Sequence, residues 1–256
     1  MNYNDKTAAI MRETASTPSV GLTLYKQVKR QMLAGLASGE WKPGEVIPAE
    51  KQLSQRFKVS IGTLRKAIDE LAAENILIRH QGRGTFVAMH SRDHHLFHFF
   101  NVIRHDGERT EPAITLERFA KTRADKQVCE KLGIAHSAKV FTYTNLLSLH
   151  GAPVEVDEIT VPEALFAGLT EAQLRNRPST VYSLYQTAFG LNVIHIEERV
   201  RACLADSRLA GLLRVQPGTA LLQIHRTAFS YHHQPVEYRL SYLNTQEYEY
   251  VPKMAQ

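Results

Sequence analysis

The feature that most constrains the fold is a series of short apolar patterns placed close together between residues 24 and 87. Apolar side chains recur every four positions from Leu24 to Leu36, which predicts an amphipathic helix. A second, short helix is expected after Pro48, and Ser60 is placed to cap a third helix. The side chains expected to face inward from this third helix are Leu64, Ile68 and Leu71.

Two short apolar runs, residues 76–78 and 85–87, follow the third helix and are joined through Gln81-Gly82-Arg83-Gly84. Apolar runs on either side of a glycine-rich tip predict a β-hairpin, because glycine readily adopts the backbone angles of a tight turn. Three helices and a hairpin in so short a span predict a winged helix-turn-helix.

The side chains that meet DNA in such a unit are expected at the start of the recognition helix, which here is the third helix. With the apolar face turned inward, Thr63, Arg65 and Lys66 remain outside and suit phosphate oxygens or the acceptor atoms of guanine. Gly62 lets the helix approach the DNA backbone closely. Arg83 at the hairpin tip is placed to reach into a minor groove, where the negative potential attracts arginine.

The distribution of charge supports a division into two functional parts. The chain has 256 residues and a formal net charge of +5. Residues 21–89 contain eleven Lys and Arg against six Asp and Glu, whereas residues 90–256 contain eighteen of each. The whole positive excess therefore lies in the first part, which predicts that this part meets a polyanion while the second part does something else.

Several classes of protein are disfavoured by the sequence. No run of eighteen apolar residues occurs, so no membrane partner is expected, and residues 1–19 lack the apolar core of a secretory signal. Cys129 and Cys203 have no Cys-x-x-Cys spacing, and no cysteine accompanies the histidines between residues 90 and 98. We therefore expect a cytoplasmic protein with no metal ion and no cofactor.

The pattern beyond the first part predicts a second, α+β domain. We expect a mobile tail at residues 1–20, a winged helix-turn-helix at 21–89, a polar linker at 90–98 and the second domain at 99–256. Strands of the second domain are predicted at residues 113–120, 140–149, 154–161, 193–204, 220–229 and 236–243, and helices at 124–132, 170–175, 181–189 and 207–213.

This second part contains an internal repeat. Leu132-Gly133-Ile134 and Leu213-Arg214-Val215 each precede a predicted strand. Pro153-Val154-Glu155 and Pro235-Val236-Glu237 each begin the strand after it, and the offset between the copies is 81 to 82 residues. Two copies of a helix-plus-hairpin unit predict a pseudo-symmetric sheet that cups a ligand between its halves.

The N-terminal motifs form a long ordered set: Leu24-Tyr25-Lys26-Gln27, Gly39-Glu40-Trp41-Lys42-Pro43-Gly44, Ile47-Pro48-Ala49-Glu50, Leu53, Val59-Ser60, Thr63-Leu64-Arg65-Lys66-Ala67 and Gln81-Gly82-Arg83-Gly84-Thr85-Phe86-Val87. This set resembles the GntR family of bacterial transcription regulators. The resemblance implies DNA contacts by Glu50, Lys51, Ser60, Thr63, Arg65, Gly82 and Arg83. Ala49 stands where the family usually has a capping serine, and Ile61 stands where it often has a base-reading arginine. We therefore expect an operator that differs from the commonest family consensus.

The C-terminal motifs also follow one order: Leu132-Gly133-Ile134, Gly151-Ala152-Pro153-Val154, Val161-Pro162, Leu165-Phe166, Val181-Tyr182, Leu184, Phe189-Gly190-Leu191, Pro217-Gly218 and Pro235-Val236-Glu237-Tyr238. They resemble the UTRA ligand-sensing domain of the HutC-type branch. The resemblance implies a chorismate-lyase-like α/β fold with a mainly antiparallel sheet. It also implies a homodimer and a small effector bound in the cleft of this domain.

The resemblance suggests which side chains contact the effector. Family members that bind phosphorylated sugars have an arginine pair where this chain has Asn145 and Leu147, so we expect an effector that is not a sugar phosphate. Arg226 matches Asn145 in the internal repeat and leaves one positive charge on the sheet. The effector-binding residues implied by the resemblance and the repeat are Phe99, Phe100, Asn101, Asn145, Asp157, Thr180, Tyr182, Arg226 and Glu237.

Together these features predict a metabolite-responsive repressor that binds a near-palindromic DNA operator as a homodimer. One alternative is a lyase-type enzyme that uses the chorismate-lyase-like domain, although no acid–base pair stands out in residues 96–250. A second alternative is a DNA-organising protein with no effector, which leaves the second domain without a role.

Overall fold

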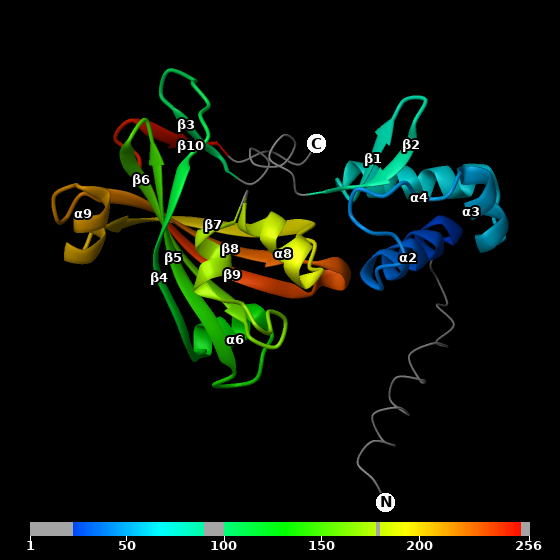
Figure 1. Ribbon diagram of the computed structural model, residues 1–256. Helices are drawn as coiled ribbons and strands as arrows, with labels where there is room; N and C mark the ends of the chain where they lie inside the picture. Colours follow the sequence, from blue (N-terminus) through cyan, green and yellow to red (C-terminus); the bar gives the residue numbers. More distant parts are fainter. Residues whose placement is uncertain (1–22, 90–99, 178–179, 252–256) are drawn as a thin grey trace, which may run out of the picture.

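The computed structural model describes residues 23–89, 100–177 and 180–251. It has two lobes: a helical N-terminal unit, coloured blue to cyan, and a larger domain built on a six-stranded sheet (Figure 1). The predicted tail, residues 1–20, and the predicted linker, residues 90–98, lie outside the described residues. No helix in the described part is long and apolar enough to cross a membrane.

The N-terminal unit has the three helices and the hairpin expected from the sequence. The helices are α2 (Leu24–Ala37), α3 (Glu50–Phe57) and α4 (Ile61–Ala73), and β1 (Leu77–His80) pairs antiparallel with β2 (Gly84–Val87). Ser60 caps α4, because its Oγ accepts a hydrogen bond from the backbone N–H of Thr63 at 3.2 Å. Ala49 offers no such acceptor to α3, and its own backbone N–H donates to Oε1 of Gln52 at 3.2 Å.

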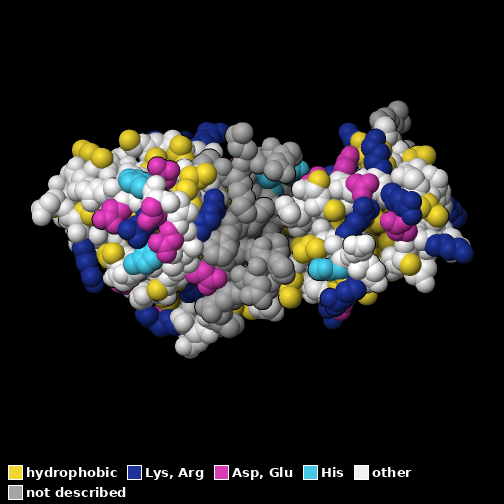
Figure 2. Space-filling view, turned by 90° about the horizontal axis from the view of Figure 1, so that it is seen from above, with side chains coloured by type: hydrophobic (Ala, Val, Ile, Leu, Met, Phe, Trp, Pro, Cys, Tyr) yellow, Lys and Arg dark blue, Asp and Glu magenta, His cyan; other side chains and the backbone are white. Residues whose placement is uncertain are grey.

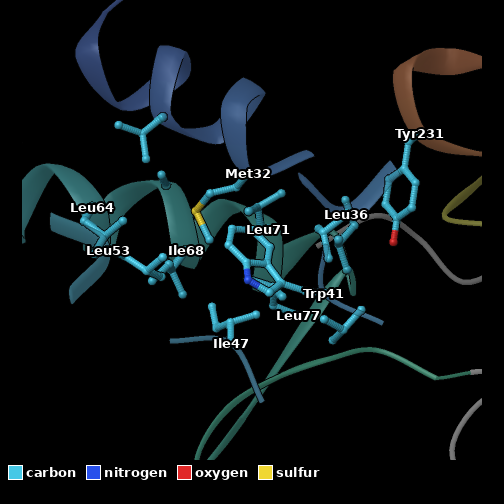
Figure 3. Close-up of a cluster of buried hydrophobic side chains, with 14 residues drawn as sticks. Met32, Leu36, Trp41, Ile47, Leu53, Leu64, Ile68, Leu71, Leu77 and Tyr231 are labelled. Atoms are coloured by element: carbon cyan, nitrogen blue, oxygen red, sulfur yellow. The ribbon is translucent and has the colours of Figure 1, made fainter. Parts of the chain in front are cut away.

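A shared apolar core holds the three helices and the hairpin together (Figure 3). Met32 of α2 packs against the inward face of α4, where Leu64 and Ile68 are almost inaccessible to water. Trp41, in the loop after α2, closes the core beside them. Burial of each such side chain contributes about 1.5–3 kcal/mol, whereas short helices are marginal in isolation. Packing therefore fixes the orientation of α4 on its neighbours.

The larger domain is an antiparallel sheet with the strand order β4-β5-β6-β9-β8-β7. Its strands are β4 (Ala113–Arg123), β5 (Lys139–Leu149), β6 (Ala152–Pro162), β7 (His195–Leu204), β8 (Ala220–Phe229) and β9 (Pro235–Asn244). Its helices are α6 (Lys126–Leu132), α7 (Glu171–Arg175), α8 (Val181–Phe189) and α9 (Ser207–Leu213). Every strand and helix expected from the sequence is present, with ends shifted by a few residues.

The domain is duplicated, as the internal repeat predicts. The elements β4-α6-β5-β6 and β7-α9-β8-β9 follow the same order, and the two copies join where β6 pairs with β9. Glu158 and Leu240, which correspond in the repeat, lie opposite each other in that pairing and mark the local pseudo-twofold axis. Asp125 and Asp206 also correspond, and each caps its helix through one side-chain oxygen, at 2.8 and 2.7 Å.

The two faces of the sheet are covered differently, because side chains alternate along each strand. On one face, Val156 of β6 packs against the apolar side of α9. On the other face, Ile159 of the same strand belongs to a cluster with Tyr185 of α8. Glu155 and Asp157 are four and two positions before Ile159 and share its face. The polar positions of β6 therefore lie on the side that α8 covers.

Two small elements were not expected from the sequence. The short strand β3 (Val102–Arg104) pairs antiparallel with β10 (Tyr248–Tyr250) in a separate two-stranded sheet. The connection between β8 and β9 contains a single helical turn, η1 (Tyr231–His233). Within it, His232 and His233 both have a positive φ, at 58° and 55°.

Candidate nucleic-acid interface and ligand cavity

The first turn of α4 presents polar groups on the outside of the N-terminal unit. Oγ of Ser60 and Oγ1 of Thr63 lie 2.9 Å apart, and Ile61 and Gly62 between them are exposed. Among the described residues, the atom that a Cβ at Gly62 would approach within 4 Å is Oγ of Ser60, at 3.9 Å. Packing within the chain therefore does not require glycine at this position, so the helix end is open to a partner.

Arg65 extends from this turn toward α3. Its Nε donates to Oε2 of Glu50 at 2.6 Å, while 62% of the Arg65 side chain remains exposed. Arg79 of β1 lies 3.9 Å from the other oxygen of Glu50 and forms a closer pair with Asp69, at 2.6 Å. Exposed ion pairs of this kind contribute about 0–1 kcal/mol. Glu50 therefore orients Arg65 without holding it firmly, and a phosphate or a base edge can replace the carboxylate.

Two lysines predicted for the same surface lie in different surroundings. Lys51 is exposed on the first turn of α3. Lys66 is also exposed, but its Nζ lies 4.1 Å from the centre of the Tyr25 ring, so the side chain leans toward α2. This cation–π contact draws the charge of Lys66 toward α2.

The hairpin between β1 and β2 holds Arg83 at its exposed tip. Gly82 and Gly84 flank it with φ of +71° and +111°. A Cβ at Gly84 would lie 3.1 Å from Cγ2 of Val46 as well as in a strained conformation. Glycine is therefore needed at position 84, where the hairpin packs against Val46. The two glycines together leave the Arg83 side chain projecting from a narrow wing.

The surface of this lobe is rich in basic side chains. Figure 2 shows Lys and Arg in dark blue over the right-hand lobe, which the N-terminal unit forms, with a few acidic side chains among them. The eleven cations of residues 21–89 all lie within residues 23–89, the part of this segment that the structure describes. A basic surface that carries an open helix end and an arginine-tipped hairpin suits the phosphate backbone and grooves of DNA.

A cavity lies on the α8 face of the large sheet. It contains about 690 Å³ of empty space, counting the part that opens to solvent. Four strands of the sheet supply polar side chains to it, and α8, β10 and the segment around β3 enclose it. Its lining consists of Phe100, Asn101, Val102, Pro112, Ile114, Asn145, Leu147, Glu155, Asp157, Thr180, Val181, Tyr182, Arg226, Arg239 and Tyr250.

Both arginines of the cavity wall are held by carboxylates. Nε of Arg226 donates to Oε1 of Glu198 at 2.6 Å. Nε of Arg239 donates to Oε1 of Glu237, and Nη1 of Arg239 donates to Oδ2 of Asp157, each at 2.9 Å. The positive charge that the sequence predicts on this sheet is therefore largely neutralised within the protein.

Glu237 lies beneath the cavity wall and does not line it. Its side chain is fully buried and accepts hydrogen bonds from the hydroxyls of Tyr182, at 3.1 Å, and Tyr185, at 2.6 Å. Burial and the negative charge of Glu237 raise the pKa of both tyrosines, so their hydroxyls stay protonated and donate. Glu237 thus anchors α8 to the sheet, which differs from the direct ligand contact expected from the resemblance.

Four buried polar atoms of the cavity lining have no hydrogen-bond partner among the described residues. Three are acceptors, Oδ1 of Asn101, Oδ1 of Asn145 and Oε2 of Glu155, and the fourth is the donor Nη2 of Arg239. Nη2 of Arg239 does lie 2.9 Å from Oε1 of Glu237, but at an angle unsuited to a hydrogen bond. Such atoms are costly to bury, and buried polar groups are normally paired, so they mark places where a ligand can bind.

Glu155 differs from the other carboxyl groups of the wall. It is 6% exposed and lies on the same face of β6 as Asp157. Burial, together with the charge of Asp157 and a hydrogen bond to it, raises the pKa of Glu155 well above its usual range. The positive charge of Arg226 opposes this effect without cancelling it.

The structure brings most of the predicted effector residues together. Those that line the cavity are Phe100, Asn101, Asn145, Asp157, Thr180, Tyr182 and Arg226. Phe99 lies outside the described residues, and Glu237 lies below the wall. Thr180 has a structural task as well, since its Oγ1 caps α8 by accepting from the backbone N–H of Ser183 at 3.1 Å.

Sequence reasoning missed Glu155, Arg239 and Tyr250. A signal for the first two was available, because a residue two positions from Asp157 or from Glu237 on a strand shares its face. Tyr250 gave no such signal. It reaches the cavity through the pairing of β10 with β3, and its hydroxyl bonds to Glu198 and Asn101.

Helix α8 also connects the cavity to the N-terminal unit. Tyr182 lines the cavity, and Nε2 of Gln186, one turn further, lies 3.5 Å from the carbonyl oxygen of Ala88. The Gln186 amide also donates to Asn192 at 2.9 Å, and Asn192 donates to the hydroxyl of Tyr231 at 2.9 Å. The Tyr231 ring packs at the edge of the core of the N-terminal unit, beside α2 (Figure 3).

Two family models match the chain. The model described as bacterial regulatory proteins of the gntR family matches residues 24–87, and the model of the UTRA domain matches residues 108–249. The first match covers the three helices and the hairpin. The second covers more than half of the chain and contains all six strands of the large sheet.

Similar proteins include named repressors. A protein of Escherichia coli (strain K12), called a probable fructoselysine utilization operon transcriptional repressor, is 31% identical over 83% of this chain and 87% of its own. The histidine utilization repressor of Klebsiella aerogenes is 28% identical over 82% of this chain and 86% of its own. Among solved structures, a ligand-binding domain assigned to the GntR family, from Bordetella bronchiseptica, is 27% identical. It covers 61% of this chain and 97% of its own, with a TM-score of 0.59.

Proposed function

The chain belongs to the GntR family of bacterial transcription regulators with a UTRA domain, and from this premise we propose that a small molecule in the cavity controls its affinity for operator DNA. The observation that supports this most strongly is the path through α8. One helix lines the cavity with Tyr182, bonds to the sheet through Tyr185 and reaches the N-terminal unit with Gln186. A ligand that shifts α8 therefore acts on the DNA-binding unit directly.

Operator DNA meets the start of α4 and the wing in this proposal. Arg65 gives up its exposed pair with Glu50 to bind a phosphate or a guanine edge, and Arg83 enters the adjacent minor groove. Ser60, Thr63, Lys51 and Gly82 approach the phosphate backbone, and Lys66 contributes from the α2 side. Two such units in a homodimer fit a near-palindromic operator, since each unit reads one half-site.

The relatives guide the biological role that we propose. Two of them are named as repressors of utilization genes, so we propose that this chain represses genes for the use of a nutrient in the cytoplasm. We further propose that the cavity binds its ligand without converting it. The effector is not a sugar phosphate in this account, because Asn145 and Leu147 supply no positive charge and both arginines are already paired with carboxylates.

The test of the DNA-binding proposal is a binding measurement on the full chain. An operator is selected from a random-sequence duplex library, and its Kd is measured by fluorescence anisotropy. Arg65→Ala should weaken binding about 5- to 150-fold, the range expected for one lost base contact. Arg199→Ala, an exposed arginine on β7, is the matched control and should bind as the parent does. Parent-like binding by Arg65→Ala at physiological salt would contradict the proposed recognition surface.

A further inference from the structure

We propose that the effector carries a protonated amine, which binds in the cavity to Oε2 of Glu155 and Oδ1 of Asn145. This inference rests on the proposed function, because it names the chemical class of the ligand for the same cavity. It is argued from the unpartnered acceptors of the wall, from the placement of charge on the sheet and from the surroundings of Glu155.

The unpartnered atoms of the cavity call mainly for hydrogen-bond donors. Asn101, Asn145 and Glu155 are each more than nine-tenths buried, and each directs at least one acceptor oxygen without a partner among the described residues. A phosphate or carboxylate presents only acceptors at neutral pH, so it leaves the amide oxygens of Asn101 and Asn145 unsatisfied. An ammonium group has three N–H donors on one atom and satisfies two or three acceptors at once.

The sheet register places two of these acceptors near each other. Asn145 of β5 lies opposite Asp157 of β6, and Leu147 lies opposite Glu155. Asn145 and Glu155 are therefore diagonal neighbours on adjacent strands and share a face, a separation that one ligand group spans. Neither acidic residue has a basic cross-strand neighbour on β5, so the cations that act on them, Arg226 and Arg239, come from β8 and β9.

Both arginines are already engaged by carboxylates other than Glu155. Arg226 is paired with Glu198, and Arg239 is paired with both Asp157 and Glu237. Oδ1 of Asp157 also accepts a hydrogen bond from Ser241. These three carboxylates thus outnumber the two guanidinium groups by one, before the charge of Glu155 is counted. An added ligand cation therefore reduces the negative excess when Glu155 is ionised, whereas an added anion increases it.

Ligand binding at Glu155 involves a proton. Without ligand, burial and the neighbouring Asp157 favour the neutral carboxylic acid, with Arg226 of β8 and Ser241 of β9 acting in the opposite direction. When an ammonium ion arrives, the carboxylic acid loses its proton to the solvent and the carboxylate forms an ion pair with the ligand. The ligand keeps its charge, and about one proton is released for each ligand bound.

The experiment is a thermal-shift panel on the full chain with matched compounds that differ by the amine. The pairs are glucosamine with glucose and 4-aminobutanoate with butanoate, and glucose 6-phosphate is added. We expect at least one compound of the amine-bearing set to raise the Tm by about 5–10 °C at a hundredfold excess over its Kd. Its amine-free counterpart should have no comparable effect.

Calorimetry on the stabilising compound then tests Glu155 itself. Titrations in phosphate and in Tris buffer, which differ in ionisation enthalpy, should show about one proton released by the parent. Glu155→Gln should lose at least tenfold in affinity and release no proton, while its unliganded Tm stays at or above that of the parent. The control is Glu197→Gln, which changes an exposed glutamate on β7 outside the cavity, and it should behave as the parent does.

Three results would overturn the amine inference. They are stabilisation by the amine-free compounds or the sugar phosphate alone, unchanged affinity in Glu155→Gln, and binding of the amine without proton release. Each of these leaves ligand control of DNA binding intact, because a ligand still occupies the cavity. A panel in which no compound stabilises the chain overturns the amine inference and counts against the proposed effector cavity as well.

Discussion

Replacing Glu155 by glutamine tests the buried carboxylic acid through the pH dependence of stability. Glutamine has the size of the neutral acid and keeps one carbonyl oxygen, so it preserves the unliganded wall. In the parent, folding raises the pKa of Glu155 because the side chain is buried beside Asp157. A carboxyl group with a raised folded-state pKa contributes its full share of stability below the unfolded-state value. That share is lost as the pH rises toward the folded-state pKa.

The size of the effect follows from the linkage relation. For each pH unit between the ordinary pKa, 4.5 for a glutamate, and the raised one, the parent loses about 1.4 kcal/mol relative to Glu155→Gln. For a chain of this length, each kcal/mol corresponds to about 2–4 °C in Tm. The Tm of Glu155→Gln minus that of the parent should therefore rise by up to about 3–6 °C for each pH unit within that interval.

Thermal unfolding of the parent, Glu155→Gln and Glu197→Gln at pH 5, 6 and 7 measures this difference. All other titrating groups are common to the three chains, so their contributions cancel in the comparison. We expect the Tm of Glu155→Gln minus that of the parent to grow with pH, and the control difference to stay flat. Parallel curves for all three proteins would refute the reasoning, because they would mean that Glu155 ionises in the folded chain as easily as in the unfolded one.

Substitutions at three other positions test the other parts of the account. Arg65→Ala should keep the parental Tm, since its ion pair is exposed, and lower operator affinity; a lowered Tm would assign Arg65 a structural role instead. Tyr231→Ala removes the ring that packs at the edge of the N-terminal core, so ligand should no longer change operator affinity. Tyr231→Phe keeps the ring and should keep most of the response to ligand. An intact response in Tyr231→Ala would contradict the path through α8. Glu237→Ala leaves the buried Arg239 with one carboxylate, which should cost about 3–5 kcal/mol and lower the Tm by at least about 6 °C; a Tm within 2 °C or so of the parent would contradict that estimate.

The elements of the fold were predictable because local patterns and packing agree. Ser60 caps α4 where a polar residue precedes an apolar face of helical period, and the same face forms the core. In the larger domain, the internal repeat predicted the duplicated sheet, because each copy has its own helix cap and its own pair of long strands. The structural pairing of β6 with β9, on which the repeat is centred, follows from that duplication.

The details of the site were less predictable, because they depend on which strands become neighbours. Glu155 is recognised as a buried acid only once β6 is placed between β5 and β9 with Leu147 opposite it. Glu237 was expected to contact the ligand, yet the hydroxyls of Tyr182 and Tyr185 cover it from α8. No local pattern in the sequence indicates that a helix closes over one strand position and leaves its neighbour open.

The most direct test of the central claim is the operator affinity of the full chain with and without a saturating ligand. The ligand is the compound that stabilises the chain most in the matched panel, and calorimetry first confirms that it is bound. We expect it to raise the Kd for the selected operator at least about fivefold, the low end of ordinary coupling between two sites. An unchanged Kd with the cavity fully occupied would show that the cavity and the DNA-binding surface are not coupled, and the account would be wrong.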